Sequence, residues 1–367
     1  MSLAVLGLGT AVPSTTVTRA QAESFARALC RSPERAARLP ALYADVGITT
    51  RHLAFERQVI DDVMSGGTTS GSVFLPTGAP DDRGPTTAQR MEHYEQHAAP
   101  LALRAAGTAL ERSGVAPEAI THVVTCSCTG FYAPGVDVAL IEGLGLPATT
   151  ERTHLGFMGC HAALNALRVA RAFVDADPSA RVLVAAVELC VIHYHYGRNP
   201  QRILANSLFA DGAGALVGVP AAAAPADAWR LEASGACLVP ASRSAMTWSI
   251  GDHGFDMTLS KEVPELIARH LRPWLSRWLA AQGLAVEEVA SWAVHPGGPR
   301  ILTAVEEALD LGERATATSR EVLDECGNMS SPTVLFVLDR LRERGAPRPC
   351  VALGFGPGLD AEAALFR

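Results

Sequence analysis

A chain of 367 residues with 48% apolar and 19% charged side chains has the composition of an ordinary globular protein. Its net charge of −7 offers no general attraction for nucleic acid or an anionic membrane surface. No stretch approaches the roughly 18 apolar residues of a membrane span, and the N-terminus lacks the basic segment of a signal peptide. The eight cysteines lack the spacing of a disulfide framework, which predicts reduced thiols and a cytoplasmic protein.

Short apolar runs alternate with helical patterns in the first part of the chain, which is typical of α/β layers with mainly parallel strands. Residues 3–8 predict a buried strand, and the Gly7-x-Gly9 pair near its end lacks the third glycine of a dinucleotide-binding turn. The elements expected next are helices over 18–30 and 33–45, a strand over 47–53, a surface loop over 59–87, a helical region over 87–112 kinked or divided at Pro100, and a buried strand over 121–126.

Cys160 follows a loop of small residues and directly precedes a helical apolar pattern. This places it at or next to a helix N-terminus, where unpaired N–H groups and the helix dipole favour a thiolate. Thiolate is the nucleophilic form of cysteine, so Cys160 is a candidate nucleophile. Gly156 and Gly159 permit a sharp turn and close approach to the sulfur. A buried structural cysteine is the alternative reading of this stretch taken alone.

The later part of the chain repeats features of the earlier part. Buried strands are expected over 181–187 and 208–218, and the alanine- and proline-rich run 220–226 is the best linker candidate. Residues 118–124 resemble residues 288–294, and the turn at Cys160 resembles the turn at Asn328 at nearly the same offset. We therefore predict two related α/β halves, 1–220 with Cys160 and 229–367 with His295 and Asn328, which bring Cys160 and Asn328 together near a pseudo-twofold axis.

His295 and Asn328 are the two polar residues that could act together with a nucleophilic Cys160. His295 directly follows a buried strand and enters a loop of prolines and glycines, the usual place for functional groups in α/β proteins. A histidine there can pair with a thiolate or polarise a carbonyl. Asn328, at an expected helix start, can offer an amide N–H to an oxyanion. A satisfied core histidine and a helix-capping asparagine are the structural alternatives.

Four motifs together resemble the type III polyketide synthases, the chalcone synthase superfamily. In chain order they are Gly-Phe-Met-Gly-Cys160-His, Trp-Ala-Val-His295-Pro-Gly-Gly-Pro, Gly-Asn328-Met-Ser-Ser and Gly354-Phe-Gly-Pro-Gly-Leu359. The resemblance covers nearly the whole chain. It implies a thiolase-like fold of two duplicated α/β halves in a layered αβαβα arrangement. It also implies a homodimer that takes CoA thioesters, malonyl-CoA and an acyl-CoA starter, into a buried site without a further cofactor.

The resemblance assigns a role to each of the three polar residues. Cys160 takes the starter acyl group as a thioester, while His295 holds the sulfur as thiolate. His295 and Asn328 bind the malonyl-CoA carbonyl and stabilise the enolate formed by decarboxylation, which attacks the Cys160 thioester. Repeated extension and cyclisation then give a pyrone, a resorcinol or a related polyketide.

Residues expected around the cavity depart from the plant pattern. Phe209 matches a gatekeeper aromatic, but Met257 replaces the second one, and Trp248 stands where plant enzymes keep a glycine. Cys190 and His193 stand where plant enzymes have threonines, and Cys128 is similar to a cavity cysteine of bacterial alkylpyrone and tetrahydroxynaphthalene synthases. Four more wall residues are implied by the motifs: Thr129, Gly297, Ser330 and Pro357.

The basic residues that contact CoA in the family are not clearly matched, and Arg38 and Arg51 are only loose candidates. The histidines in His193-Tyr194-His195-Tyr196 lack a third ligand at supporting spacing, so no metal site is expected.

Three other functions are alternatives to the polyketide synthase interpretation. A ketoacyl synthase III of fatty-acid synthesis shares the fold and the Cys-His-Asn logic, but usually follows its histidine with Gln-Ala-Asn and lacks the terminal glycine motif. An inactive scaffold of the same fold is expected to lose the three residues that this chain keeps. A cysteine hydrolase also uses Cys and His, and would consume malonyl-CoA without condensation.

Overall fold

A nine-stranded mixed sheet runs through the computed structural model, which describes residues 2–367. In spatial order its strands are β11 (Ser291–Val294), β12 (Cys350–Gly356), β13 (Asp360–Phe366), β8 (Trp229–Leu238), β1 (Leu3–Ala11), β7 (Asp211–Pro220), β6 (Val182–Leu189), β4 (His122–Ser127) and β5 (Glu151–Gly156). Two two-stranded sheets are separate from it, one formed by β9 (Met246–Gly251) with β10 (Gly254–Leu259) and one by β2 (Thr15–Thr18) with β3 (Thr50–Leu53).

The α-helices connect these strands and cover the sheet. They are α1 (Arg19–Leu29), α2 (Pro33–Ala36), α3 (Leu39–Asp45), α4 (Arg57–Ser65), α5 (Thr87–Ser113), α6 (Val136–Leu144), α7 (Ala162–Ala176), α8 (Pro200–Leu208), α9 (Val263–Ala280), α10 (Pro299–Leu309), α11 (Ala317–Cys326) and α12 (Thr333–Glu343). Short 3₁₀ turns include η1 (Pro117–Ala119), η2 (Cys190–His193), η3 (Ala221–Ala223), η4 (Val286–Glu288) and η5 (Glu313–Thr316).

The sheet repeats one strand pattern twice. In the first half, β4 is parallel to β6, and β6, β7 and β1 then pair antiparallel in that order. In the second half, β11 is parallel to β12, and β12, β13 and β8 pair antiparallel in the same order. The halves join where β1 pairs with β8. The prediction of two duplicated α/β halves is therefore confirmed, with η1 and η4 preceding the corresponding strands β4 and β11.

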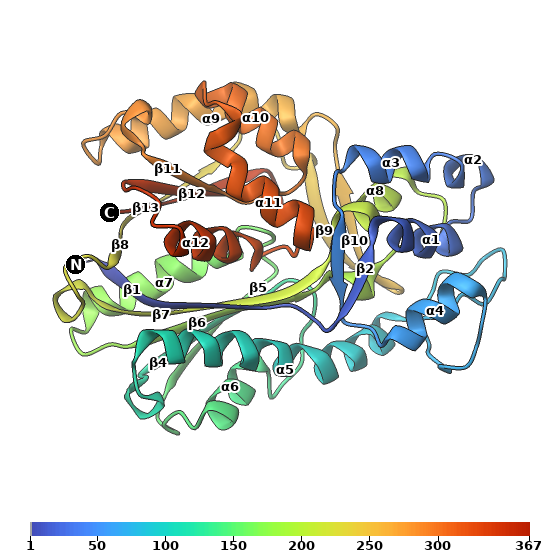
Figure 1. Cartoon of the computed structure of the whole chain (residues 1–367), viewed down its shortest axis with the longest axis horizontal. Helices are drawn as coiled ribbons and strands as arrows, with labels where there is room; N and C mark the ends of the chain where they lie inside the picture. Colours follow the sequence, from blue (N-terminus) through green and yellow to red (C-terminus); the bar gives the residue numbers. More distant parts are fainter. Residues whose placement is uncertain (1) are drawn as a thin grey trace.

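The helices and sheet halves form five layers (Figure 1). Helices α9 and α10 lie over the second half, α5 and α6 lie over the first half, and α7 and α12 lie between the two halves. The first turns of the central helices are buried on all sides because both faces are covered: α7 buries a continuous run from Ala162 to Leu167 and α12 one from Thr333 to Asp339. This arrangement confirms the layered αβαβα prediction.

Two local expectations need correction. Helix α5 runs unbroken through Pro100, although that proline cannot donate the usual backbone hydrogen bond. Its buried alanine face packs on β1, β7 and β6 and stabilises the helix across this point. The loop predicted over 59–87 is shorter, because α4 occupies residues 57–65 and buries Val59, Ile60 and Val63 at helical spacing.

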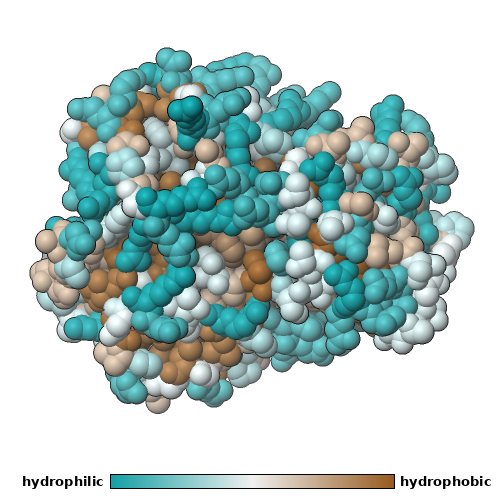
Figure 2. Space-filling model, viewed as in Figure 1, coloured by the Kyte–Doolittle hydropathy of each residue, from teal (hydrophilic) through white to brown (hydrophobic). Residues whose placement is uncertain are grey.

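Residues 221–228 link β7 to β8 and contain most of the predicted linker run. The boundary between an N-terminal unit over 1–220 and a C-terminal unit over 229–367 stays a prediction. Within residues 2–367, no helix has the length and apolar character needed to cross a membrane. The face shown in Figure 2 is mostly hydrophilic, with hydrophobic atoms gathered at its lower left.

The contact between β1 and α5 gives a test of this packing. A Cβ on Gly9 would collide with the Ala105 carbonyl oxygen and the Ala109 amide of α5, both of which are backbone atoms. We expect Gly9→Ala to lower the free energy of unfolding by about 1–3 kcal/mol. Gly107→Ala is the control in the same helix, because its Cβ would come no nearer than 3.9 Å to Leu144. It should raise stability by about 0.5–1 kcal/mol, as measured by denaturant titration; equal effects of both changes would contradict the account.

Candidate active site

Cys160 lies in the loop between β5 and α7. Phe157 and Gly159 adopt positive φ angles of 62° and 87°, which turn the chain so that α7 begins two residues after the cysteine. A side chain on Gly159 would collide with Pro357, so both its backbone angle and its surroundings require glycine. The predicted position of Cys160 next to a helix N-terminus is confirmed.

The Cys160 thiol is buried, with the residue only 6% exposed. Burial raises the pKa of this thiol to about 11, although hydrogen bonds from Ser330 and Asn328 lower it. The position next to the helix N-terminus therefore does not by itself give a thiolate, because the free-energy cost of burying the negative charge is larger than the stabilisation that the helix end provides. A nearby cation is needed.

His295 follows β11 directly and is held by a 2.7 Å hydrogen bond from its backbone N–H to the Leu353 carbonyl. Its side chain is buried, and among the described residues neither ring nitrogen has a hydrogen-bond partner. Burial, together with the charge of His161, lowers the pKa of His295 to about 3. Both ring nitrogens thus remain available to a thiolate or a substrate.

Asn328 connects the two halves of the site. Its backbone N–H donates to the Leu208 carbonyl at 3.0 Å, and its carbonyl accepts from Ala210 at 2.9 Å, on either side of Phe209. Its side-chain Nδ2 donates to the Gly297 carbonyl at 3.3 Å, two residues after His295, while Oδ1 accepts from the Ser330 N–H. The expectation that Asn328 opens a helix is wrong, because α12 begins only at Thr333.

Cys160, His295 and Asn328 line one cavity of about 460 Å³, here called the central cavity. They come from three separate stretches of the chain and from both duplicated halves. Phe209, Met257 and Gly297 line the same space. The structure therefore brings the three polar candidates together in the wall of one cavity.

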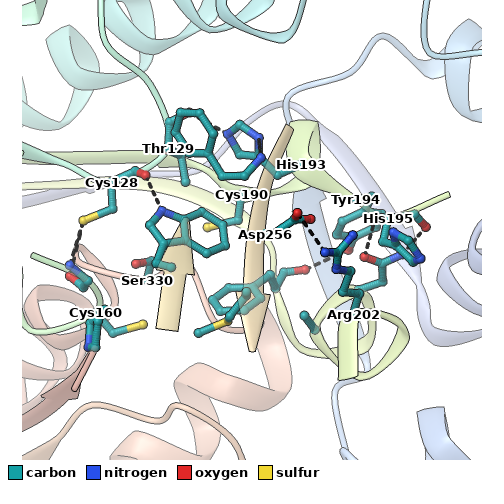
Figure 3. A pocket seen from close by; sticks show the side chains of 18 of the residues that line it. Cys128, Thr129, Cys160, Cys190, His193, Tyr194, His195, Arg202, Asp256 and Ser330 are labelled. Atoms are coloured by element: carbon teal, nitrogen blue, oxygen red, sulfur yellow. Dashed lines mark hydrogen bonds and ion pairs between the residues drawn. The ribbon is translucent and has the colours of Figure 1, made fainter. Parts of the chain in front are cut away.

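A second space of about 650 Å³, here called the side cavity, adjoins the central cavity at Cys160, Phe209 and Met257. Its wall contains the other candidates from the sequence: Cys128, Thr129, Cys190, His193, Trp248, Ser330 and Pro357. Figure 3 shows several of these side chains around the space. Phe209 and Met257 lie at the junction, as expected for gatekeepers.

Hydrogen bonds fix the polar members of this wall. Trp248 donates from Nε1 to the Cys128 carbonyl at 2.8 Å, so its ring stands across the cavity wall. His193 donates from Nε2 to the Thr129 carbonyl at 2.7 Å and accepts from the Phe255 N–H at Nδ1. Burial lowers the pKa of His193 to about 3, so the ring is neutral, and its two nitrogens are already occupied. It contributes shape rather than acid–base chemistry.

Two supporting residues were missed from the sequence. Glu188 is buried behind the wall, where it accepts from Thr129 Oγ1 at 2.7 Å, Ser331 Oγ at 2.6 Å and the Cys128 N–H at 2.9 Å. It is the one charged residue in the apolar strand β6, a signal that could have identified it.

His161 is the second, and it immediately follows Cys160. Its Nδ1 lies 2.8 Å from Asn165 Oδ1 and its Nε2 lies 3.4 Å from the Asp360 carboxylate. Its ring also packs on the backbone at Gly356, where a Cβ would collide with it. His161 therefore holds the turn that contributes Phe355 and Pro357 to the two cavities.

The two arginines that were expected to contact CoA differ in their exposure to solvent. Arg38 is exposed at the start of α3 and only 4.0 Å from Glu34. Arg51 is fully buried, donates to the Ser207 carbonyl and lies over the Tyr43 ring at 5.0 Å. A fully buried guanidinium cannot meet a ligand arriving from solvent, so the interpretation of Arg51 as a CoA contact is wrong.

A wider opening, here called the outer cleft, has a volume of about 1290 Å³ and shares Leu208, Leu259, Gly297 and Ile301 with the central cavity. Lys261 and Arg300 line it, and neither was singled out from the sequence. Arg300 directly follows the His295 loop, which was a usable signal. Among residues 2–367, no group of three or more metal-ligating side chains is gathered.

Comparison with known proteins identifies the family. The N-terminal domain of chalcone and stilbene synthases matches residues 2–221, and the C-terminal domain of the same family matches residues 230–367. The chain belongs to this family, the type III polyketide synthases. The alternative of a ketoacyl synthase III is not supported.

Relatives of this polyketide synthase span its whole length. It is 30% identical to "Alpha-pyrone synthesis polyketide synthase-like Pks18" of Mycobacterium tuberculosis, over 98% of this chain and 90% of that protein. It is 28% identical to "Type III polyketide synthase C" of Arabidopsis thaliana, over 99% and 94% of the two chains. The crystal structure of PKS-I from the brown alga Ectocarpus siliculosus superposes with a TM-score of 0.90 at 31% identity, covering 100% of this chain and 98% of that one.

Trp248 provides a test of the cavity wall. Trp248→Gly removes an indole ring that lines the side cavity and so enlarges the cavity, and we expect longer products or acceptance of larger starters, read by mass spectrometry. Trp248→Phe keeps an aromatic ring but loses the hydrogen bond to Cys128, and should retain the original product length. An unchanged product profile in Trp248→Gly would show that the indole does not limit the chain.

Proposed function

We propose that this type III polyketide synthase condenses malonyl-CoA units onto an acyl starter carried by Cys160 and then cyclises the chain to a pyrone, resorcinol or related polyketide. The observation that carries the proposal is the central cavity, which is lined by a buried thiol, an amide donor and an imidazole whose two nitrogens have no hydrogen-bond partner among residues 2–367. The printed name of the mycobacterial relative, which refers to alpha-pyrone synthesis, favours a pyrone among these products.

Loading begins with transfer of the Cys160 proton to His295. The thiolate attacks the carbonyl of the acyl-CoA starter, the C–S bond to CoA breaks, and CoA leaves as its thiol after taking up the proton. Because burial disfavours each charge alone, the thiolate and the imidazolium are formed together as a pair of zero net charge.

Extension uses His295 and Asn328 as hydrogen-bond donors. They bind the thioester oxygen of malonyl-CoA, and loss of CO₂ leaves the electron pair as an enolate on that oxygen. The enolate carbon attacks the Cys160 thioester, a C–C bond forms, and the sulfur leaves as thiolate. The Ser330 N–H donates to Oδ1 of Asn328, and one N–H of Nδ2 donates to the Gly297 carbonyl, so the second N–H of Nδ2 is the donor assigned to the substrate in this proposal.

The CoA portion lies in the outer cleft in this proposal. Lys261 and Arg300 provide positive charge there for the phosphates, and the cleft is continuous with the central cavity through Gly297 and Ile301. Arg38, exposed at the start of α3, remains a further candidate, since Leu42 and Asp45 of that helix line the cleft.

We also infer a homodimer. Strand β5 forms one edge of the large sheet and is largely exposed, and the apolar side chains of Phe131 and Met158 are each 39% exposed near it. An open strand edge with neighbouring apolar groups favours contact with a second copy. A cytoplasmic location stays a prediction.

The direct test is incubation of the purified protein with labelled malonyl-CoA and acyl-CoA starters from acetyl to long-chain, with products identified by mass spectrometry. Polyketides that carry the starter chain are expected. Malonyl-CoA consumption without carbon–carbon bond formation would contradict the proposal and favour a hydrolase.

Cys160→Ala should remove both acyl loading and product, because Cys160 is the one thiol among the described residues that line the central cavity. The mass of the intact protein after exposure to a starter CoA reports loading separately from turnover. Product formation by this variant at the wild-type rate would contradict the role of Cys160 as the nucleophile.

Asn328→Ala should slow malonyl-CoA decarboxylation more than starter loading, by about 10²–10³-fold in kcat, the cost of losing one oxyanion donor. Release of labelled CO₂ measures the first step and intact mass measures the second. A larger loss in loading than in decarboxylation would mean that the role of Asn328 is misassigned.

A further inference from the structure

The side cavity contains a charged pair that the proposed reaction does not use. Arg202 on α8 and Asp256 on β10 form an ion pair with 2.8 Å between Nη2 and Oδ2, and both line the cavity. Their side chains are 28% and 34% exposed, so the pair lies where the cavity approaches solvent. Figure 3 shows them on the opposite side of the view from Cys160, with Asp256 pointing toward Arg202.

Arg202 keeps hydrogen-bonding capacity that the surrounding protein does not use. Its Nε is buried and has no partner among the described residues. The neighbouring Asn206 cannot supply one, since both ends of its amide bond the backbone of His195. Burial, with the charge of Arg202, lowers the pKa of His195 to about 4, so this ring is neutral. Within the described wall of the side cavity, Arg202 is therefore the one permanent cation.

The wall between Cys160 and this pair is largely apolar. Phe209, Met246, Trp248, Phe255 and Met257 supply most of it. A chain attached to Cys160 thus lies along hydrocarbon and aromatic surface, and its far end meets a guanidinium. An alkyl end would displace water from the ion pair without replacing its hydrogen bonds, which is unfavourable. A carboxylate or keto oxygen would accept charge-assisted hydrogen bonds there.

We propose that Arg202 is a specificity-determining residue that binds an oxygen-bearing far end of the acyl chain, a carboxylate or keto group, and that Asp256 moderates its charge. The chemical class selected is an acyl starter with a polar ω-end in preference to an unfunctionalised alkyl chain. The proposal rests on the proposed function, because it takes Cys160 as the point of attachment. It requires no change in the condensation chemistry.

The test compares kcat/KM for succinyl-CoA and hexanoyl-CoA as starters, with malonyl-CoA as the extender. Arg202→Gln removes the cation, so the succinyl-to-hexanoyl ratio should fall at least tenfold. Asp256→Asn leaves the cation uncompensated, so the ratio should rise about threefold or more. Both substitutions break the same ion pair, and a purely structural role therefore predicts changes in the same direction. Changes in the same direction, or an unchanged ratio in both variants, would overturn the proposal.

Two controls keep the result interpretable. Arg269→Gln with Glu265→Gln removes an exposed ion pair of equal 2.8 Å length on α9 and should leave the ratio unchanged. If Arg202→Gln is unstable, Arg202→Lys keeps the charge and should keep the preference for succinyl-CoA; its loss there would contradict the proposal. Absence of condensation in the wild type with every starter from acetyl-CoA to long-chain acyl-CoA, succinyl-CoA included, refutes the proposed function itself, whereas condensation with an insensitive ratio refutes only the role of Arg202.

Discussion

Cys160 and His295 are buried in one cavity, where neither a thiolate alone nor an imidazolium alone is stable. Burial raises the pKa of the thiol to about 11 and lowers that of the imidazole to about 3. Transfer of one proton between them replaces two neutral groups by an ion pair without changing the net charge, so the attraction between the new charges offsets part of their desolvation. Other residues support this proton transfer: Asn328 supplies a hydrogen-bond donor, and Gly159 and Pro357 fix the position of the sulfur. No residue within 2–367 hydrogen-bonds the imidazole of His295, so both of its nitrogens are available.

The duplicated architecture explains how such residues meet. Strand order and direction are the same in the two halves, and the central helices α7 and α12 occupy equivalent places between them. Cys160 precedes one of these helices and Asn328 precedes the other, so the pseudo-symmetry brings the two loops to one cavity. The two halves contribute different functional groups: the first half contributes the nucleophile Cys160, and the second half contributes His295 and the amide donor Asn328. The departures from the plant pattern at Met257 and Trp248 both lie in the wall of the side cavity.

Sequence reasoning gave the fold and the grouping of the central residues because both depend on local patterns and on motif order. The recurrence of residues 118–124 at 288–294 corresponds to two equivalent strands, and the small-residue loop at Cys160 corresponds to a real turn into a helix. Sequence reasoning was wrong where contacts between residues far apart in the chain determine the surroundings of a side chain or the continuity of a helix. The side chain of Arg51 lies in the core beside Tyr43, which its position in a polar stretch did not suggest, and Pro100 is tolerated because α5 is held on three strands. Arg202 and Lys261 needed the folded chain, since no local motif reveals which wall or opening a side chain lines.

The most direct measurement is the pH dependence of Cys160 alkylation by iodoacetamide in the wild type and in His295→Gln, followed by peptide mass spectrometry so that the other cysteines do not contribute. Pairing with His295 predicts that the wild-type cysteine reacts at neutral pH, with an apparent pKa below the usual value of about 8.5. Loss of the imidazole should move the profile upward, toward the pKa of about 11 that results from burial, partly offset by the hydrogen bonds from Ser330 and Asn328. Superimposable profiles for the two proteins would contradict the ion pair on which this account of the chemistry depends.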